Sequence, residues 1–176
     1  MSDAIMSDVI IRAVDEEYGW LGNMSAHDVQ HEGKWWKTAE ALFQALRYPM
    51  GAVNDIGENI REIIRAQKSP MTAKLKAKAR VIRDQRNITP MGNEDLDNMR
   101  MVLRLKFKWN CNPLERDLLE TGDRLIVEDC SNRPNVSGLF WGAKRLADGT
   151  WEGTNMLGQL LMELRTEIRN RPAVQK

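Results

Sequence analysis

Residues 34–49, KWWKTAEALFQALRYP, combine a predicted amphipathic helix with side chains suited to acid–base and phosphate-binding chemistry. If Thr38 caps the helix, a core-facing stripe recurs at Leu42, Ala45, Leu46 and Pro49. A neighbouring stripe carries a carboxylate, an aromatic ring, an amide and a guanidinium, at Glu40, Phe43, Gln44 and Arg47. A carboxylate can stabilise a cation or activate water, and a guanidinium can hold phosphate through two donors. This second stripe therefore either faces solvent or lines a site.

A second pair of carboxylates follows the predicted strand 123–128. Glu128 and Asp129 stand where this strand meets a long loop, 129–140. Active groups are common at such positions, although plain turn-forming residues also occur there. Both carboxylates are therefore candidates for catalysis.

Beyond the loop, two tryptophan-glycine elements precede the last helix, at Trp141-Gly142 and Trp151-Glu152-Gly153. The helix entrance Gly153-Thr154-Asn155 offers backbone N–H groups that an anion could bind. In the alternative interpretation, both tryptophans are core residues and Asn155 is a helix cap.

The densest basic segment is KLKAKARVIR, residues 74–83, in which Lys74, Lys78 and Arg83 share a helical face. This face could meet phosphates, but no aromatic residues interleave for base stacking, so a solvated helix face is favoured. The two histidines, His27 and His31, have no acidic or cysteine partner at fixed spacing, and we expect them at the surface.

Composition excludes several other classes of protein. The 26 basic and 25 acidic residues leave a net charge of +1, which gives no argument for nucleic-acid or membrane affinity. Cys111 and Cys130 form no CxxC motif, and neither has a histidine at the spacing of metal ligands. We therefore expect reduced thiols and no metal. No apolar run approaches the ~20 residues of a membrane span, and the first eight residues do not resemble a signal peptide. We expect a cytoplasmic protein with no cofactor and no membrane partner.

The 176 residues predict one α+β domain that is mainly helical with a few short strands. Strand-like segments are 9–14, 29–36 (two pieces joined at Glu32-Gly33) and 123–128. Helices are expected near 38–48, 54–67, 70–83, 94–108 and 113–120, with a last helix from Thr154. Ser69-Pro70 and Asn112-Pro113 each place a cap before a proline at the first helical position, and Gly122 ends a helix. The domain is expected over 9–170, with flexible ends at 1–8 and 171–176.

Six segments together resemble the NADAR family, the YbiA-like N-glycosidases. They occur in order over about residues 18–168: YGWLGNMS, WKTAEALFQALRY, SPMTAK, MRMVLRLKFKWNCNPLERDLLETGDRLIVE, WGA and WEGTNMLGQLLMELR. Each piece alone is weak, and their order carries the resemblance. It implies a compact, mainly helical fold and hydrolysis of a bond between ribose C1′ and nitrogen.

By position, Glu40 falls on the acid of the family segment Ser-x-Glu-His-x-x-Gln-Ala, and Glu128 on the acid that closes the strand. The resemblance implies catalytic roles for Glu40 and Glu128 and substrate-binding roles for Gln44, Lys106, Trp141, Gly142 and Asn155. Beside these, Asp129 is a candidate catalytic residue, and Asn23, Arg47 and Trp151 are candidate substrate-binding residues.

Three positions depart from the family pattern. Ala41 replaces a histidine, Arg47 stands where many members have lysine, and Gly138 stands where many have aspartate. Arginine stays protonated and does not readily form an imine, so a covalent mechanism through that lysine would be lost. If the aspartate is essential elsewhere, Asp129 or Glu128 must substitute, or the activity has changed.

Cleavage of an N-ribosyl bond passes through an oxocarbenium-like transition state, which a carboxylate beneath C1′ stabilises. Glu40 would supply that charge or activate water, and Arg47 and Lys106 would hold phosphate. Flat surfaces for a base are offered by Trp35, Trp36, Trp141 and Trp151.

The resemblance implies two substrate groups, phosphoribosylated riboflavin intermediates and ADP-ribose attached to guanine. The basic residues Arg133, Lys144 and Arg145 favour removal of the ADP-ribosyl group, and a modified nucleic acid is a candidate partner. The alternatives are a phosphoribosylated riboflavin intermediate as substrate, or a module that binds ADP-ribose or NAD without cleaving it. The missing histidine and aspartate favour the binding module. The sequence does not give the oligomeric state.

Overall fold

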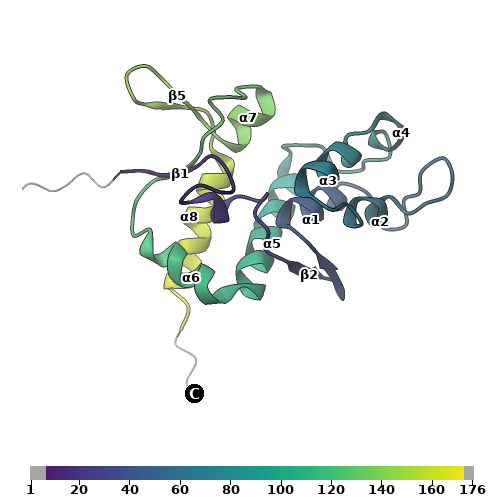
Figure 1. Ribbon diagram of the computed structural model, residues 1–176, viewed down its shortest axis with the longest axis horizontal. Helices are drawn as coiled ribbons and strands as arrows, with labels where there is room; N and C mark the ends of the chain where they lie inside the picture. The colour runs from purple at the N-terminus through teal and green to yellow at the C-terminus, as the bar shows by residue number, and fades with distance from the viewer. Residues whose placement is uncertain (1–6, 173–176) are drawn as a thin grey trace, which may run out of the picture. The chain divides into compact units, whose positions relative to one another are not determined.

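Helices dominate the structure, a computed structural model that describes residues 7–172, and the strands are few and short (Figure 1). The α+β class expected from the sequence is therefore confirmed. Internal contacts divide the chain into two units. The central unit is Asn23–Asn110, and the terminal unit combines Met1–Gly22 with Cys111–Lys176. The single domain over 9–170 stays a prediction, and the expected flexible ends lie mostly outside the described residues.

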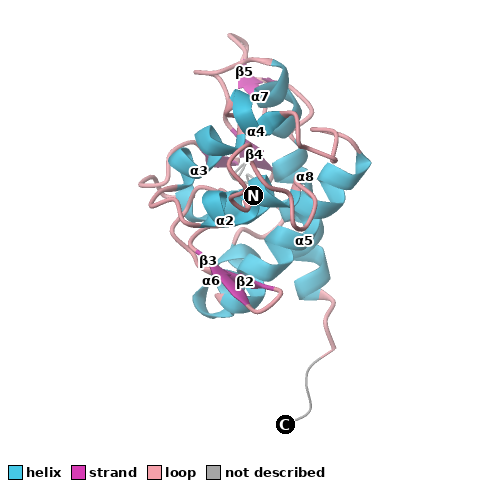
Figure 2. Ribbon diagram, turned by 90° about the vertical axis from the view of Figure 1, so that its right-hand side faces the viewer, coloured by secondary structure: helices cyan, strands magenta, loops and turns pink. Residues whose placement is uncertain are grey.

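The central unit begins with a hairpin of β2 (Val29–His31) and β3 (Lys34–Trp36), drawn in magenta in Figure 2. Glu32 and Gly33 form its two-residue turn, with φ of 49° and 74°. Positive φ at both central residues matches the twist of the strands, and glycine adopts it without strain. The expected junction at Glu32-Gly33 is confirmed.

Helix α1 (Ala39–Leu46) follows the hairpin directly. The hydroxyl of Thr38 accepts a hydrogen bond from Ala41 N at 3.2 Å, which satisfies one free donor of the first turn. All eight residues of α1 are buried, and the helix packs against α2 (Ile60–Arg65), α3 (Pro70–Ala77) and α5 (Asn93–Trp109). Its polar stripe is therefore not a solvated face.

Two of the expected helices are shorter or broken. Helix α2 starts only at Ile60, because Asn54 Oδ1 accepts hydrogen bonds from two backbone N–H groups, of Ile56 and Glu58, and holds the preceding residues in a turn. The predicted helix 70–83 is two helices, α3 and the short α4 (Arg80–Arg83).

The break after α3 has a long-range cause. A continuous helix would need the carbonyl of Ala77, but that carbonyl accepts hydrogen bonds from the Tyr48 hydroxyl and from Arg86. Ala79 is extended, with ψ of 137°. The start of α3 is as expected, since Ser69 and Thr72 form a capping box before Pro70. The expectation that Arg83 shares one helical face with Lys74 and Lys78 is wrong.

In the terminal unit, β1 (Val9–Ile11) pairs in parallel with β4 (Ile126–Glu128). Helix α8 (Met156–Arg169) packs on β4 and on α6 (Cys111–Glu120), and a short 3-10 helix, η1, covers Gly19–Leu21. Gly122, with φ of 62°, follows α6 as predicted. Asn112 has non-helical dihedrals inside α6.

The expected loop 129–140 is only partly a loop. It contains the start of helix α7 (Val136–Trp141), whose first turn is capped by Asn135 Oδ1 accepting from Gly138 N at 2.9 Å. After it, β5 (Lys144–Arg145) and β6 (Trp151–Glu152) form a small antiparallel pair that the sequence did not predict. None of the α7 residues is fully buried, so its apolar pattern gives little signal.

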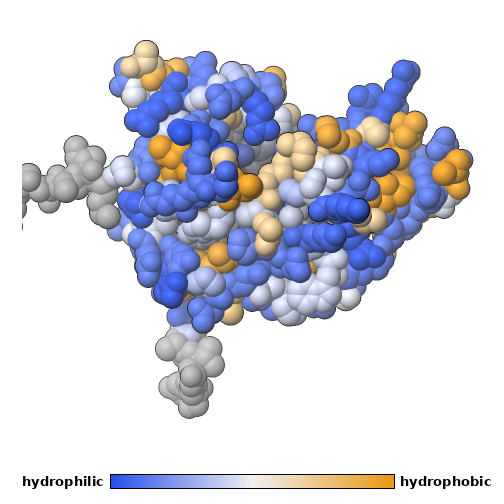
Figure 3. Space-filling model, in the orientation of Figure 1, coloured by the Kyte–Doolittle hydropathy of each residue, from blue (hydrophilic) through white to orange (hydrophobic). Residues whose placement is uncertain are grey.

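Most of the face drawn in Figure 3 is hydrophilic, with hydrophobic residues interspersed. Between residues 7 and 172, no helix has the length and apolar character needed to cross a membrane.

Candidate active site

Glu40 lies in the first turn of α1 with a side chain that is 5% exposed. Its Oε1 accepts a hydrogen bond from Gln44 Nε2 at 2.9 Å and lies 3.6 Å from Lys74 Nζ on α3. Among the described residues Oε2 accepts no hydrogen bond, and it is not one of the buried atoms left unpaired, so it reaches solvent. One oxygen is thus fixed and the other is available to a ligand.

Gln44 is oriented by Arg47. The Arg47 Nη1 donates to Gln44 Oε1 at 3.2 Å, which identifies that end of the amide as the acceptor. The Nε2 end is then left to donate to Glu40. The guanidinium also lies 4.5 Å above the centre of the Phe43 ring, a favourable cation–π geometry. The polar stripe is therefore connected through Gln44 and Arg47, with Glu40 at one end and Phe43 at the other.

The fork of Arg47 points to Asp95, in the first turn of α5. Nε and Nη2 of Arg47 donate to the two Asp95 oxygens at 2.8 and 2.7 Å, and both side chains are buried. Met91 N donates to Asp95 Oδ2 at 2.8 Å. Sequence reasoning missed Asp95, since an acid in a first helical turn ordinarily only complements the helix dipole. The Arg47 donors expected to hold phosphate are engaged by Asp95 and Gln44.

The basic segment after Pro70 contributes to the charge around Glu40. Lys74 is the direct neighbour of Glu40, and Lys78 is close enough for the charge of Glu40 to affect the pKa of Lys78. Burial lowers the pKa of Lys78, the charge of Lys74 lowers it further, and the charge of Glu40 opposes the shift. Lys74 is therefore more than part of a solvated helix face.

Lys106 lies on α5 with no exposed surface. Its Nζ donates to Ser25 Oγ at 2.8 Å, and that oxygen is 3.0 Å from His27 Nδ1. Burial lowers the pKa of Lys106 to about 7. Burial, followed by the charge of Lys106, lowers the pKa of His27, while Asp28 opposes the shift. Lys106 is thus a buried amine in a Lys–Ser–His chain, and His27, expected at the surface, is half-buried.

Asn23 touches the start of α1 through its backbone. Its carbonyl accepts a hydrogen bond from Glu40 N at 3.0 Å, and its Nδ2 donates to Met99 Sδ at 2.9 Å. The Asn23 Oδ1 is buried and has no partner within the described residues. A buried acceptor of this kind is costly unless water or a ligand satisfies it.

In the terminal unit, Asn155 binds to the edge of β4 opposite β1, next to the bridge that Ala143 forms with Asp129. Its Nδ2 donates to Ile126 O at 2.8 Å, and its Oδ1 accepts from Glu128 N at 3.1 Å. Asn155 is the N-cap residue of α8, as the alternative interpretation expected, but it has φ of 54° and its side chain makes no cap hydrogen bond. The amide takes the place of a neighbouring strand beside Glu128.

Two glycines of the recognised motifs also lie against β4. A Cβ on Gly142 would lie 2.2 Å from Glu128 O, and a Cβ on Gly158 would lie 2.1 Å from Ile126 O. Both approaches are too close for any side chain. The Trp-Gly and Asn-x-Leu-Gly motifs therefore fix the backbone that carries Glu128.

Asp129 is tied to two neighbours. Arg12 Nε and Ser131 N donate to its carboxylate at 2.9 and 2.8 Å. Burial of Asp129 opposes its ionisation, but the hydrogen bonds from Ser131 and Arg12 outweigh burial and hold the pKa of the carboxyl below its usual value. Asp129 is therefore better suited to carry a negative charge than to donate a proton.

The tryptophans of this unit are half-buried rather than core. Trp141 meets Phe140 edge-on at 5.0 Å between ring centres. Trp151 donates from Nε1 to Asp8 at 2.9 Å, and Arg145 lies 5.2 Å from its ring centre. The guanidinium of Arg145 occupies one side of the Trp151 ring.

Gly138, at the position where many family members have aspartate, lies in α7 close to the preceding loop. A Cβ there would be 2.3 Å from Arg133 O. No aspartate fits at this position with the present backbone, so the difference at Gly138 involves the loop as well as one side chain.

The structure thus joins Glu40, Gln44 and Arg47 in one network, and brings Gly142 and Asn155 to the backbone of Glu128. Lys106 belongs to a hydrogen-bonded chain with Ser25 and His27. The pairing of Glu40 with Glu128 or Asp129 stays a prediction, because these carboxylates belong to different units. In residues 7–172 no group of three or more His, Cys, Asp or Glu side chains could hold a metal ion.

Comparison with known proteins gives consistent matches. A family model described as NADAR domain matches residues 11–169. N-glycosidase YbiA of Escherichia coli strain K12 is 33% identical over 168 residues, which cover 93% of this chain and 91% of that protein. N-glycosidase Npun_R5314 of Nostoc punctiforme is 30% identical, with 88% of each chain covered.

Two further matches extend this relationship. The riboflavin biosynthesis protein PYRR of Zea mays is 31% identical over 86% of this chain, which spans 23% of that longer protein. The NMR structure of E. coli YbiA has a TM-score of 0.69 and 29% identity, and the match covers 98% of this chain and 94% of that one.

Proposed function

The chain belongs to the NADAR domain family, and on that premise we propose that it is an N-glycosidase that hydrolyses a ribose C1′–N bond. The family membership expected from the order of the motifs is confirmed. Relatives named N-glycosidases are consistent with the expected hydrolase of N-glycosyl bonds.

The observation that carries the proposal is the asymmetric carboxylate of Glu40. Gln44 and Lys74 fix Oε1, whereas Oε2 reaches solvent. A carboxylate held in this way is preorganised to stabilise a developing oxocarbenium ion or to take a proton from water. In the reaction, the C1′–N electron pair leaves with the base, the water oxygen bonds to C1′, and Oε2 accepts the water proton.

The leaving base needs a proton or a positive environment, and a second acid would supply it. The two expected partners are Glu128 and Asp129. The hydrogen bonds to Asp129 favour the ionised form of Asp129, which cannot donate a proton, so Glu128 suits this role better. Gly142 and Asn155 fix the backbone at Glu128. We propose Glu128 as the partner acid.

As substrate we propose an ADP-ribosyl group on guanine. Support comes from the basic side chains that follow β4, at Arg133, Lys144 and Arg145, of which Arg133 and Arg145 are exposed. Cationic side chains of this kind suit a diphosphate. Arg47, which the sequence predicted to bind phosphate, is not part of this group, because its Nε and Nη2 donate to Asp95.

The direct test is release of ADP-ribose from an ADP-ribosylated guanine oligonucleotide by Glu40→Gln. We expect kcat to fall by about a hundredfold or more, since a positioned acid–base group contributes roughly that factor. Glu94→Gln, an exposed acid of the same unit, is the matched control and keeps normal turnover. Unchanged turnover in Glu40→Gln, with melting temperatures equal, would remove Glu40 from the chemistry.

A second candidate substrate is a phosphoribosylated riboflavin intermediate, favoured by the match to the maize riboflavin biosynthesis protein. Parallel assays on this monophosphate and on ADP-ribosylated guanine separate the two. Selective hydrolysis of the monophosphate would assign the chain to the smaller substrate.

The alternative is a module that binds ADP-ribose or NAD without cleaving it. Ala41 and Gly138 support it, because they stand where many relatives have a histidine and an aspartate. The close contact at Gly138 excludes an aspartate there. Heat stabilisation by ADP-ribose without any product in mass spectrometry of either substrate reaction would favour a binding module.

A further inference from the structure

Two tryptophans of the central unit form an exposed pair away from the Glu40 network. Trp35 on β3 is 50% exposed and Trp109 at the end of α5 is 41% exposed. Their ring centres are 5.2 Å apart, with an angle of 64° between the ring planes. Such exposure of two large aromatic rings side by side is unusual unless the surface binds something.

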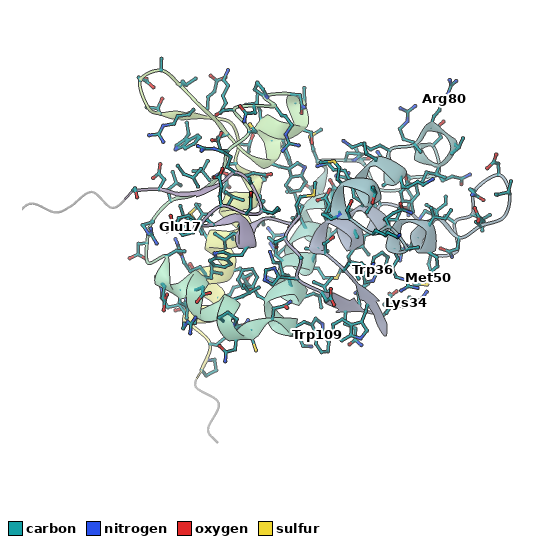
Figure 4. The ribbon with its side chains drawn as sticks, in the orientation of Figure 1. Glu17, Lys34, Trp36, Met50, Arg80 and Trp109 are labelled. Atoms are coloured by element: carbon teal, nitrogen blue, oxygen red, sulfur yellow. The ribbon has the colours of Figure 1, made fainter. Side chains whose placement is uncertain are left out.

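Several hydrogen bonds hold these rings in place. Trp109 Nε1 donates to Gln30 O on β2 at 3.1 Å, and Asn110 Nδ2 donates to Asp28 O at 2.9 Å. Gln30 is the cross-strand partner of Trp35. Figure 4 shows Trp109 at the end of its helix, next to the hairpin that carries Lys34. The two rings are therefore preorganised, which lowers the entropic cost of binding a partner.

Mixed charges surround the pair. Lys108 Nζ lies 5.4 Å from the centre of the Trp109 ring, and Glu62 binds both Lys34 and Arg65. On and beside the hairpin, on α2 and at the end of α5, the partly or fully exposed cationic side chains are Lys34, Lys37, Arg61, Arg65 and Lys108, and the anionic ones are Asp28, Glu32 and Glu62. A small positive excess next to flat apolar rings suits a ligand with bases to stack and few phosphates to neutralise.

We propose that the Trp35–Trp109 surface stacks unpaired bases of a single-stranded nucleic acid that carries the modified nucleotide. This inference rests on the proposed function and specifies that the modified guanine belongs to a single strand. Stacking on indole rings tolerates any sequence, because every base has a flat face. The surface would hold flanking nucleotides while the modified one enters the site.

The distance to the Glu40 network is compatible with this role. Trp35 precedes Glu40 by five residues, so their Cα atoms lie at most about 18 Å apart. That separation corresponds to no more than about five stacked base steps of ~3.4 Å. One short strand can therefore contact both places.

A second copy of the chain fits the surface less well. Two half-exposed indole rings offer roughly 200 Å², whereas a stable interface buries about 800 Å² on each partner. The charged side chains around the rings would also lose their solvation in a dimer. Self-association is therefore an outcome to test rather than the expected one.

The test measures fluorescence anisotropy of a labelled, unmodified twelve-nucleotide single strand with the full chain. We expect Trp35→Ala and Trp109→Ala each to weaken binding about tenfold or more, and Trp35→Phe and Trp109→Phe to retain most of it. Ile56→Ala removes another exposed apolar side chain of the same unit and is the matched control. The affinity should fall only weakly with salt, with a logarithmic slope of roughly −1, and a duplex of equal length should bind less tightly.

Binding that is unchanged in Trp35→Ala, or equal for duplex and single strand, would overturn the proposal. Sedimentation that shows wild-type dimers and monomeric Trp35→Ala would assign the surface to self-association instead. Because the oligonucleotide is unmodified, these outcomes do not depend on hydrolysis. A wild-type protein that binds the strand but releases no ADP-ribose would retain the surface and refute the proposed activity.

Discussion

Arg47 is the residue whose expected role changes most. The sequence predicts that it binds phosphate through two donors. In the structure its Nε and Nη2 donate to Asp95, and its Nη1 donates to Gln44 and orients that amide. Arginine can make these three contacts at once because its donors lie in one plane, which a lysine ammonium cannot reproduce. Arg47 thus belongs to the network that positions Glu40.

Asp95→Asn should therefore destabilise the protein strongly. The variant leaves the buried Arg47 guanidinium without its counter-charge, and we expect the free energy of unfolding in urea to drop by about 3 kcal/mol or more. Asp97→Asn is the control on the same helix, since Asp97 pairs with Arg100 at the surface and should contribute at most about 1 kcal/mol. Equal losses in the two variants would contradict the importance of the buried pair.

Lys106 predicts a distinctive dependence of stability on pH. Its pKa is about 7 in the folded state against an ordinary 10.5, so between these values the unfolded chain holds more of the proton. The free energy of unfolding should thus rise with pH across this window, by about 1 kcal/mol per unit. Urea denaturation at pH 7 and pH 9 measures the rise, and Lys106→Met should lose it, whereas the exposed Lys108→Met should retain it.

At the scale of elements, the sequence predicted those features whose cause is local. The cap at Thr38, the turn at Glu32-Gly33 and the cap at Ser69 were all predicted, because each depends on residues a few positions apart. The break after α3 was not predicted, since it depends on Tyr48, 29 residues from Ala77. Short elements with little burial, α7 and the β5–β6 pair, also escaped.

The same division applies to the candidate site. Glu40 and Gln44 were found from one helical stripe, and their contact is confirmed. Asp95 was missed because it is 48 residues from Arg47 and an ordinary helix-start acid by position. The hydrogen-bonded chain from Lys106 through Ser25 to His27 could likewise not be predicted from the sequence, since 81 residues separate Lys106 from Ser25.

The junction of β4 and α8 gives a prediction at this scale. Asn155→Asp keeps the acceptor for Glu128 N but replaces the donor to Ile126 O with a carboxylate oxygen. We expect a loss of about 1–3 kcal/mol in the free energy of unfolding, because the carbonyl is left unpaired and faces a negative charge. Asn132→Asp, in the exposed loop of the same unit, should lie within about 0.5 kcal/mol of wild type.

At the scale of the whole molecule, the two units differ in how the chain builds them. The central unit is one continuous stretch, whereas the terminal unit combines both ends of the chain through the parallel pairing of β1 with β4. That pairing joins residues such as Val9 and Ile126, so it must close a loop of more than a hundred residues. Closure of this size is slow relative to local helix packing.

Refolding should reflect this difference. In pulsed hydrogen exchange, we expect amides of α1 and α5 to become protected before those that join β1 and β4. The amide of Val9, which donates to Leu125 O, is a specific reporter of the late step. Simultaneous protection of Val9 and the α1 amides would contradict the order.

The contact of Asn155 with β4 has a further consequence for the protein in a crowded solution. A two-stranded sheet has open rims, and an unpaired rim of a buried apolar strand is a template for another polypeptide. On β4 one edge is paired with β1, and on the other the Asn155 amide occupies the Ile126 carbonyl and the Glu128 N–H while Ala143 N donates to the Glu128 carbonyl. Asn155 and Ala143 thus together protect the strand against aggregation while they hold the backbone of an acid in place.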